Sequence, residues 1–330
     1  MGRETDAVIP ARVPAACAVC GETSDRTLFS APDPDGRDAE PFRIARCEGC
    51  ALAFVSPRPP ESDLGRYYAA GYYDKPGEDS GRVGRLLAGM FMAERVGRVD
   101  GLRSRGRLLD VGCGEGTFLA AMSRRGWEAW GVEISSEGAA RAAARPGLVI
   151  HQKPLAECAL PSGHFDVITL WHSIEHVSDP GAVLREARRL LKDDGRLFLA
   201  FPNPESWDFK LFGARWFHLD PPRHLNYFSP ETMTRLLDAA GFATVRVGGF
   251  SLEYNPFGFV QSVLNFLTGR MNYFYRGMKG GLPPAERSRG DLLLTVLLLP
   301  ALAVISLPYT FLAAAVGASG CVDVAAAKKL

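Results

Sequence analysis

The chain has 330 residues and a formal net charge of +1; 47% of its residues are hydrophobic and 23% are charged. This composition supports a sizeable core and excludes disorder as the overall class. The near-neutral charge disfavours a nucleic-acid partner, which usually requires a basic face, so we expect no nucleic acid to bind. Residues 1–17 contain no apolar segment behind a basic start, which predicts no secretory signal and a cytoplasmic location.

Residues 1–56 contain two C-x-x-C pairs, Cys17/Cys20 and Cys47/Cys50, separated by about 26 residues. In a reducing compartment, paired cysteines at this spacing indicate a metal site rather than a disulfide framework. Four thiolates would hold a structural zinc ion in a closed tetrahedral site that has no open position for catalysis. We therefore expect a small N-terminal zinc ribbon.

Residues 57–104 are predicted to connect this ribbon to the main domain. Their first part, residues 57–82, is rich in Pro, Tyr and Gly, which is typical of a linker. A leading helix is expected to follow over residues 83–99.

Residues 105–250 alternate between strand-like and helix-like segments, and we assign them to a core domain together with residues 321–330. Such alternation predicts a parallel sheet covered on both faces, and right-handed crossovers make it doubly wound. The expected strands are 107–111, 128–133, 148–151, 165–170, 196–201, 244–250 and 321–327. The expected helices are 117–125, 136–144, 180–191 and 230–240. The predicted fold class is therefore α/β, with a seven-stranded, mostly parallel sheet.

Residues 251–320 form an apolar insertion before the last strand. No charged residue lies between Asp291 and Asp323, and this span is long enough to cross a bilayer as a helix. Pro300 and Pro308 are expected to interrupt that helix. Residues 256–275 are aromatic and amphipathic, and nearby basic residues suit anionic headgroups.

The position of the last strand limits how this insertion can meet a membrane. If residues 321–327 pair near residues 244–250, both ends of the insertion lie on one side of any bilayer. A single crossing is then excluded, whereas a re-entrant or in-plane insertion remains open. The alternative is a helical lid or a homodimer interface that is buried against protein.

The most informative motif is the segment from Asp110 to Gly116, DVGCGEG, which follows an apolar strand and precedes a helix. Glycines there allow a sharp turn and a close backbone approach to a ligand. Glu133 ends the next strand, where a carboxylate can bind both hydroxyls of a ribose. Together these features indicate a nucleotide-binding site at the carboxyl end of the sheet.

Residues 105–250 resemble the class I methyltransferase family, which has a Rossmann-like core. DVGCGEG resembles its first motif, VEIS its ribose-binding segment, FDVITLWHSIEHVSDP its fourth strand and loop, and LLKDDGRLFLAFPN its fifth strand. A dinucleotide-binding dehydrogenase is the main competitor, but its fingerprint is G-x-G-x-x-G and the segment here is G-x-G-x-G. A degenerate fold without cofactor is the other alternative.

The resemblance implies S-adenosylmethionine as cofactor and assigns its contacts. Asp110 would support the amino group, and Glu133 would bind the ribose. Many members carry an acid near the adenine after the third strand, but HQKPLAECALP has none directly after the strand, so Leu155 would serve through its backbone amide. The glycines that would pack against the methionine and ribose are Gly112, Gly114 and Gly116.

Three histidines are the candidate catalytic residues. His172 and His176 follow the fourth core strand, at the edge where ligands bind in such sheets. His224 lies in an aromatic and polar segment, residues 216–228, that in the family closes over the acceptor. Histidine suits removal of a hydroxyl proton near neutral pH. The alternative is that these side chains cap helices or bind backbone groups.

The zinc ribbon ahead of this core resembles sugar C-methyltransferases and related bacterial enzymes of polysaccharide or lipid assembly. The additional C-terminal domain of the sugar enzymes is not apparent here. We therefore expect methyl transfer, most simply to oxygen, on a small-molecule or lipid-linked acceptor such as a saccharide or quinone. The enzyme is expected at the inner face of the cell membrane. A nucleotide-sugar methyltransferase and an inactive membrane scaffold are the alternatives.

Overall fold

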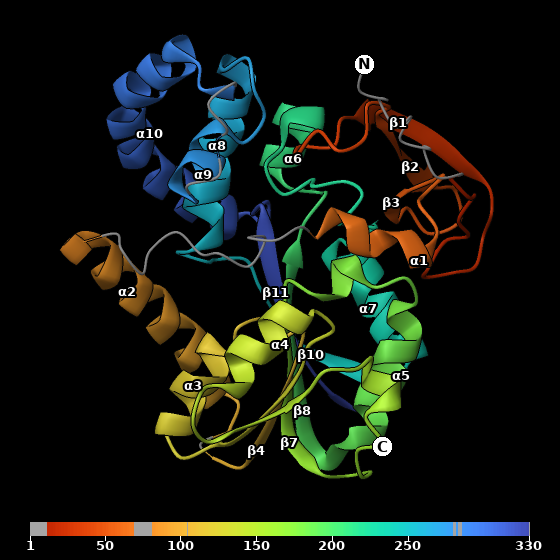
Figure 1. Cartoon of the computed structure of the whole chain (residues 1–330). Coiled ribbons are helices and arrows are strands. Elements are labelled where there is room, and N and C mark those ends of the chain that lie inside the picture. Colours follow the sequence, from red (N-terminus) through yellow and green to blue (C-terminus); the bar gives the residue numbers. More distant parts are fainter. Residues whose placement is uncertain (1–11, 69–80, 104, 280–281, 283–285, 330) are drawn as a thin grey trace, which may run out of the picture.

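The computed structural model describes residues 12–68, 81–103, 105–279, 282 and 286–329. Its strands form a seven-stranded sheet of order β10-β11-β8-β7-β4-β5-β6 and a four-stranded sheet of order β1-β2-β3-β9. Figure 1 shows the large sheet at the centre of the molecule, the small sheet beside it, and the helices of the apolar insertion at the opposite upper corner.

The elements have the following bounds. The strands are β1 Asp25–Ala31, β2 Phe42–Cys47, β3 Ala53–Val55, β4 Arg107–Val111, β5 Glu128–Val132, β6 Leu148–His151, β7 Phe165–Trp171, β8 Leu191–Pro202, β9 Asn226–Tyr227, β10 Phe242–Gly248 and β11 Cys321–Lys328. The helices are α1 Glu61–Leu64, α2 Gly81–Asp100, α3 Thr117–Arg124, α4 Ser136–Ala143, α5 Pro180–Leu190, α6 Trp207–Phe212, α7 Pro230–Ala239, α8 Tyr254–Leu267, α9 Tyr273–Met278 and α10 Arg289–Ala315. Single 3-10 turns are η1 Gly65–Tyr67, η2 Leu155–Glu157, η3 Ile174–His176 and η4 Gly213–Arg215.

The seven-stranded sheet has the predicted class of topology. Strands β6, β5, β4, β7 and β8 pair in parallel, and β11 is antiparallel to both β8 and β10. The expected pairing of residues 321–327 beside residues 244–250 is confirmed. Both ends of the apolar insertion therefore return to the same sheet.

Apolar side chains from helices cover both faces of this sheet. Val99 of α2, Leu119 of α3 and Ala142 of α4 pack on one face. Leu190 of α5 and Leu237 of α7 pack on the other, and Figure 1 shows the two groups of helices on opposite sides. All five side chains are 0% exposed, and a fully buried Leu or Val contributes about 1.5–3 kcal/mol to folding.

The small sheet is not confined to the N-terminal region. Its fourth strand, β9, lies between β8 and α7 in the sequence and pairs antiparallel with β3. Tyr67, from the predicted linker, is fully buried beside Trp216 and Tyr227 in the core of this sheet. The N-terminal unit therefore packs directly on the segment that follows β8. The rest of the linker, residues 69–80, lies outside the described residues.

The apolar insertion forms α8, α9 and α10. Unlike the sequence-based expectation, α10 continues through Pro300 and Pro308 over 27 residues. Each proline removes one backbone donor, but the turns between them keep their hydrogen bonds, so the helix does not end. Within the described residues, α10 is the one helix long and apolar enough to cross a membrane, and only 11% of its most apolar segment is buried in the protein.

Candidate active site

The glycine-rich turn connects β4 to α3 at the carboxyl edge of the large sheet. Gly112, Gly114 and Gly116 have φ angles of +77°, +53° and +69°, a region that favours glycine. At Gly112 an added Cβ would lie 2.7 Å from the Cβ of Ser173, so the turn also has no room for a side chain there. The sequence thus predicted both the position of this turn and its need for glycine.

The other predicted cofactor-binding residues lie along the same edge. Glu133, directly after β5, accepts hydrogen bonds from Gly114 N and Ser135 N, both at 2.8 Å. Asp110, in β4, accepts from Thr169 Oγ1 at 2.7 Å. Leu155 is buried and opens η2 after β6. The structure therefore brings all six predicted cofactor residues to the ends of three adjacent strands.

The turn after β7 lies against the glycine turn. Ser173 Oγ donates to the carbonyl of Val111 at 2.8 Å, which fixes this turn at the end of β4. His172, just before it, has a positive φ of +49°, and its N–H donates to the carbonyl of Ala200 at 2.9 Å. Residues on this turn therefore lie next to the predicted cofactor site.

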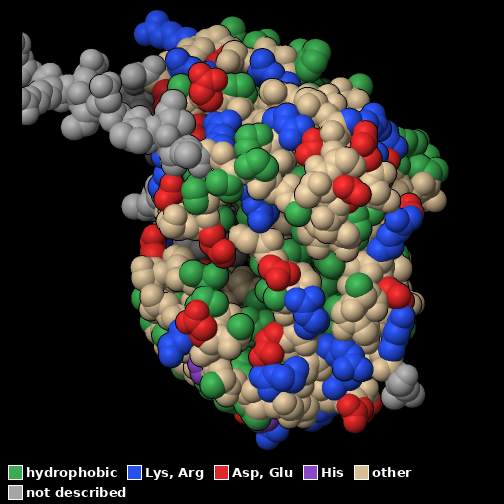
Figure 2. All heavy atoms as spheres, turned by 90° about the vertical axis from the view of Figure 1, so that its right-hand side faces the viewer, with side chains coloured by type: hydrophobic (Ala, Val, Ile, Leu, Met, Phe, Trp, Pro, Cys, Tyr) green, Lys and Arg blue, Asp and Glu red, His purple; other side chains and the backbone are tan. Residues whose placement is uncertain are grey.

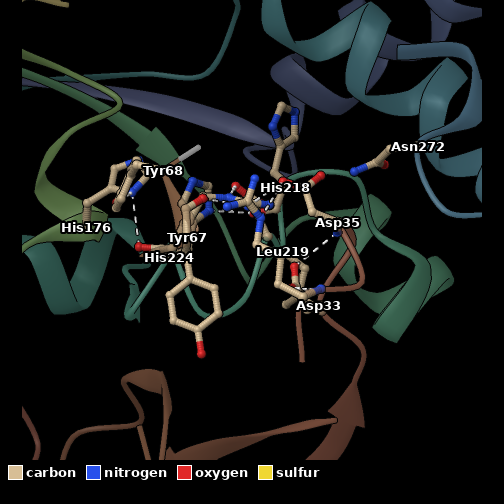
Figure 3. A network of polar contacts seen from close by, with 12 residues as sticks. Asp33, Asp35, Tyr67, Tyr68, His176, His218, Leu219, His224 and Asn272 are labelled. Carbon is tan, nitrogen blue, oxygen red and sulfur yellow. Dashed lines mark hydrogen bonds and ion pairs between the residues drawn. The ribbon is translucent and has the colours of Figure 1, made fainter. Parts of the chain in front are cut away.

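His176 and His224 come together from distant parts of the chain. Their ring centroids are 4.6 Å apart, and Figure 3 shows both close to Tyr68. His224 Nδ1 donates to the carbonyl of His218 at 2.9 Å. His176 Nδ1 lies 3.0 Å from the carbonyl of Arg223 and 2.9 Å from the Tyr68 hydroxyl. The sequence placed both histidines at the acceptor side, and the structure brings them into contact.

His172 occupies a neighbouring pocket. Its ring centroid is 3.9 Å from that of Tyr254, the first residue of α8. Arg95 of α2 lies over the rings of both Tyr254 and Trp171, at 5.3 Å and 5.6 Å, and lines the same pocket. Arg95 and Tyr254 were not predicted as site residues, because each lies on a helix outside the recognised motifs.

Glu175, which was not among the predicted site residues, lies at the centre of this cluster. Its side chain is fully buried, and neither carboxylate oxygen has a hydrogen-bond partner. His172 Nδ1 and His224 Nε2 lie 3.4 Å and 4.0 Å from Glu175 Oε1. The sequence feature that could have identified it is its position directly before His176.

Burial controls the charge of these groups. It raises the pKa of Glu175, lowers the pKa of His172 to about 3 and lowers the pKa of His176 to about 4. The pKa of His224 is also lowered, again mainly by burial. The three imidazoles are therefore neutral near pH 7, so each has one nitrogen lone pair.

Arg223 anchors the acceptor-side segment to the N-terminal unit. Its guanidinium forms an ion pair with Asp220 and donates to Asp35 Oδ2 at 2.7 Å and to the carbonyl of Tyr67 at 3.2 Å. Burial of Asp220 is outweighed by Arg223, so the pKa of Asp220 is lowered to about 2. Figure 3 shows this network between the small sheet and the histidines.

On the face shown in Figure 2, the molecule is hollowed near its middle, and hydrophobic and acidic side chains border the hollow. Basic and acidic side chains alternate over the rest of that face.

The four predicted zinc ligands lie together in the N-terminal unit. Cys17 and Cys50 have their Sγ atoms 3.4 Å apart, those of Cys20 and Cys47 are 3.5 Å apart, and all four atoms lie within 4.8 Å of one another. Sulfur atoms around one tetrahedral zinc are about 3.8 Å apart, so the cluster fits that ion. Burial raises the pKa of Cys50 to about 11, and a bound cation would favour its thiolate.

Comparison with known proteins agrees with this geometry. A family model described as a methyltransferase domain matches residues 87–247. The ubiquinone biosynthesis O-methyltransferase of Idiomarina loihiensis is 31% identical over 176 residues, which are 49% of this chain and 71% of that protein. The enzyme of the same name from Caulobacter vibrioides is 36% identical over 45% of this chain and 63% of that protein. A solved methyltransferase from Archaeoglobus fulgidus has 20% identity, a TM-score of 0.47, and coverage of 73% of this chain and 94% of its own.

The doubly wound sheet and the glycine turn at its carboxyl edge define a Rossmann-like methyltransferase. The chain belongs to the class I S-adenosylmethionine-dependent methyltransferase family and is an enzyme of that family. The family model ends before the apolar insertion and begins after the cysteine pairs. These two regions are therefore additions to the shared domain.

The cysteine cluster predicts about one zinc ion per chain. A Cys17→Ser/Cys47→Ser variant should lose this zinc in elemental analysis and unfold at a lower temperature, because two of four ligands are removed. Cys158→Ser is the matched control, since Cys158 lies outside the cluster, and it should keep the zinc. Full zinc occupancy in the double variant would contradict the site.

The position of Glu133 predicts a role in cofactor affinity. Glu133→Gln removes a charged acceptor and should weaken S-adenosylmethionine binding by about 10- to 100-fold, as for hydrogen bonds to charged groups. Calorimetric titration measures this effect. Glu128→Gln, at the opposite end of β5 and ion-paired at the surface with Arg107, should bind as the wild type does. Equal affinity of the two variants for S-adenosylmethionine would contradict a role for Glu133 in cofactor binding.

Proposed function

We propose that this enzyme transfers a methyl group from S-adenosylmethionine to a hydroxyl oxygen of a quinone-like or other lipid-linked acceptor at a membrane surface. The relatives named ubiquinone biosynthesis O-methyltransferases support the reaction class. The observation that carries the membrane part is the exposed, apolar α10 and its physical connection to the pocket around His172.

That connection runs through α8. Phe259 of α8 stacks on Tyr309 of α10, with ring centroids 4.1 Å apart. Tyr254, at the start of α8, packs against His172 with the two rings tilted by 38°. Since one helix contacts both the apolar helix and the pocket, an acceptor held by its lipid part near α10 can place a polar head near His172 over a short path.

The exposed face of α10 suits contact with lipid. Leu293, Leu297 and Val304 are 60%, 66% and 73% exposed, and their spacing places them on one side of the helix. A soluble monomer rarely exposes an apolar surface of this length without a partner. Because β10 and β11 hold both ends of the insertion, we propose in-plane or re-entrant contact with the inner face of the cell membrane.

The basic residues near this helix contribute less than the sequence suggested. Arg276 forms an ion pair with Glu286 at 2.7 Å, so its charge is already paired. Lys279 lies over the ring of Tyr275 at 4.9 Å. The proposed membrane contact therefore rests on apolar burial rather than on attraction to anionic headgroups.

The chemistry at the site follows from the charges of its residues. S-adenosylmethionine, when bound, supplies an electrophilic methyl group on a positively charged sulfur. The glycine turn and Glu133 would hold its nucleoside, and Asp110 its amino group. The neutral histidines on the acceptor side, His172, His176 and His224, would orient the acceptor hydroxyl and accept its proton.

The acceptor class is tested by product analysis. Purified enzyme is incubated with methyl-labelled S-adenosylmethionine and separated soluble and membrane fractions of a bacterial lysate. We expect the label in organic-extractable material from the membrane fraction. The labelled methyl group should resist alkali, as a methyl ether does. Label only in water-soluble small molecules would overturn the lipid-linked acceptor and favour a nucleotide-sugar substrate.

Membrane contact is tested by flotation with liposomes. Leu293→Glu/Leu297→Glu should reduce the floating fraction severalfold, because each burial of a charge in the lipid core is costly. Val245→Glu/Val247→Glu, on exposed residues of β10, is the matched control and should float as the wild type does. A wild type that stays at the bottom of the gradient, and a dimer that the α10 variant dissociates, would identify α10 as a homodimer interface instead.

A further inference from the structure

The cluster around Glu175 contains an arrangement that methyl transfer alone does not require. Glu175, His176 and His224 each present one ligand atom, and these atoms lie within 4.8 Å of one another. They come from two separate segments, η3 and the stretch before β9, which the hydrogen bond from Leu225 N to the Glu175 carbonyl joins at 2.9 Å. The cluster is therefore held by the fold rather than by local sequence.

The carboxylate of Glu175 lacks compensation. It is fully buried, and neither oxygen has a hydrogen-bond partner. An isolated carboxylate in such surroundings is strongly disfavoured unless it is protonated or paired with a cation. His172 Nδ1 and His224 Nε2 lie 3.4 Å and 4.0 Å from Glu175 Oε1 without forming a hydrogen bond to it. The Arg223 guanidinium is engaged by Asp35 and Asp220 instead.

The two histidines are oriented as metal ligands usually are. His224 Nδ1 donates to the carbonyl of His218, and His176 Nδ1 is within reach of the carbonyl of Arg223. A donor hydrogen on Nδ1 leaves the lone pair on Nε2. Metal-bound histidines commonly have their second nitrogen tied to a backbone carbonyl or carboxylate in this way, which fixes the tautomer and the ring.

We propose that Glu175, His176 and His224 bind one divalent transition-metal ion. Two imidazoles and one carboxylate form a ligand set that suits zinc, iron, cobalt or nickel. Ligand atoms around such an ion are about 3–3.5 Å apart at ordinary bond lengths. The three ligand atoms lie within 4.8 Å of one another, and Glu175 Oε1 and His224 Nε2 are 4.0 Å apart. Binding therefore requires these side chains to move inward by about 1 Å.

This site differs from the four-cysteine cluster in its chemistry. Four thiolates close a tetrahedral site, whereas three protein ligands leave coordination positions open. Ser173, two residues before Glu175, ties this turn to the end of β4, so an ion at Glu175 would lie close to the proposed cofactor site. An acceptor hydroxyl bound there would ionise more readily and pass its proton to the unpartnered Nε2 of His172, which is not a metal ligand. Its oxygen would then be ready to accept the methyl group.

Only the catalytic role of this ion rests on the proposed O-methylation; its binding does not. Metal binding is therefore measured without any acceptor. The purified protein is cleared of weakly held ions with a mild chelator, which would leave zinc at the predicted four-cysteine site, and is then titrated with Co²⁺. Calorimetry gives the stoichiometry, and the visible spectrum shows the ligands.

We expect the wild type to bind about one equivalent of Co²⁺ without a sulfur-to-cobalt charge-transfer band. Glu175→Gln, which is nearly isosteric and removes a buried charge, should weaken Co²⁺ binding by about 100-fold or more and keep the affinity for S-adenosylmethionine. Glu133→Gln is the matched control: it is also a buried acid at a strand end, and it should bind Co²⁺ normally while losing cofactor affinity.

Two results would overturn the proposal. One is equal Co²⁺ binding by wild type and Glu175→Gln, and the other is a charge-transfer band that places the cobalt at the cysteines. If Glu175→Gln also loses the cofactor, His224→Gln decides in its place: unchanged Co²⁺ binding there would equally reject the site. Metal binding with no methylated product would preserve this site and reject the proposed function instead.

Discussion

The backbone of Leu225 hydrogen-bonds in two directions at once. Its N–H donates to the carbonyl of Glu175, and its carbonyl accepts from the N–H of Val55 in β3, both at 2.9 Å. One peptide segment thus links the turn after β7 to the small N-terminal sheet. The position of His224 and the burial of Glu175 depend on this connection, and so does the packing of the cysteine-bearing unit. The connection joins groups from the N-terminal unit and from the core domain.

The parts of the fold that follow from local rules were predictable. In apolar strands that end in glycine or an acid, such as β4 and β5, about ten residues of sequence are enough to predict burial and a ligand-binding role. Five of the six residues predicted to bind the cofactor were chosen from these two patterns, whereas Leu155 was chosen from the family resemblance. By contrast, β9 contains two residues and pairs with β3, over 170 positions earlier, so nothing local in Asn226 or Tyr227 indicates a strand.

The acceptor side shows the same division. His172 and His176 stood out because histidine near a strand end suggests chemistry, and His224 stood out because it lies in an aromatic and polar segment. Glu175, Arg95 and Arg223 did not, since an acid or arginine is ordinary on a surface and becomes unusual only when tertiary packing removes water from it. The path of α10 through two prolines was also missed, because the rule that proline ends helices is weaker in long helices that retain their remaining bonds.

Strand β11 has a further consequence for how the chain reaches this structure. It lies inside the large sheet between β8 and β10, yet residues 249–320 separate it from β10 in the sequence. During synthesis, β8 and β10 are therefore complete while the space between them has no strand. The sheet can be completed only after the apolar insertion and β11 have left the ribosome. If the insertion contacts lipid before then, the catalytic domain completes its folding at the membrane surface.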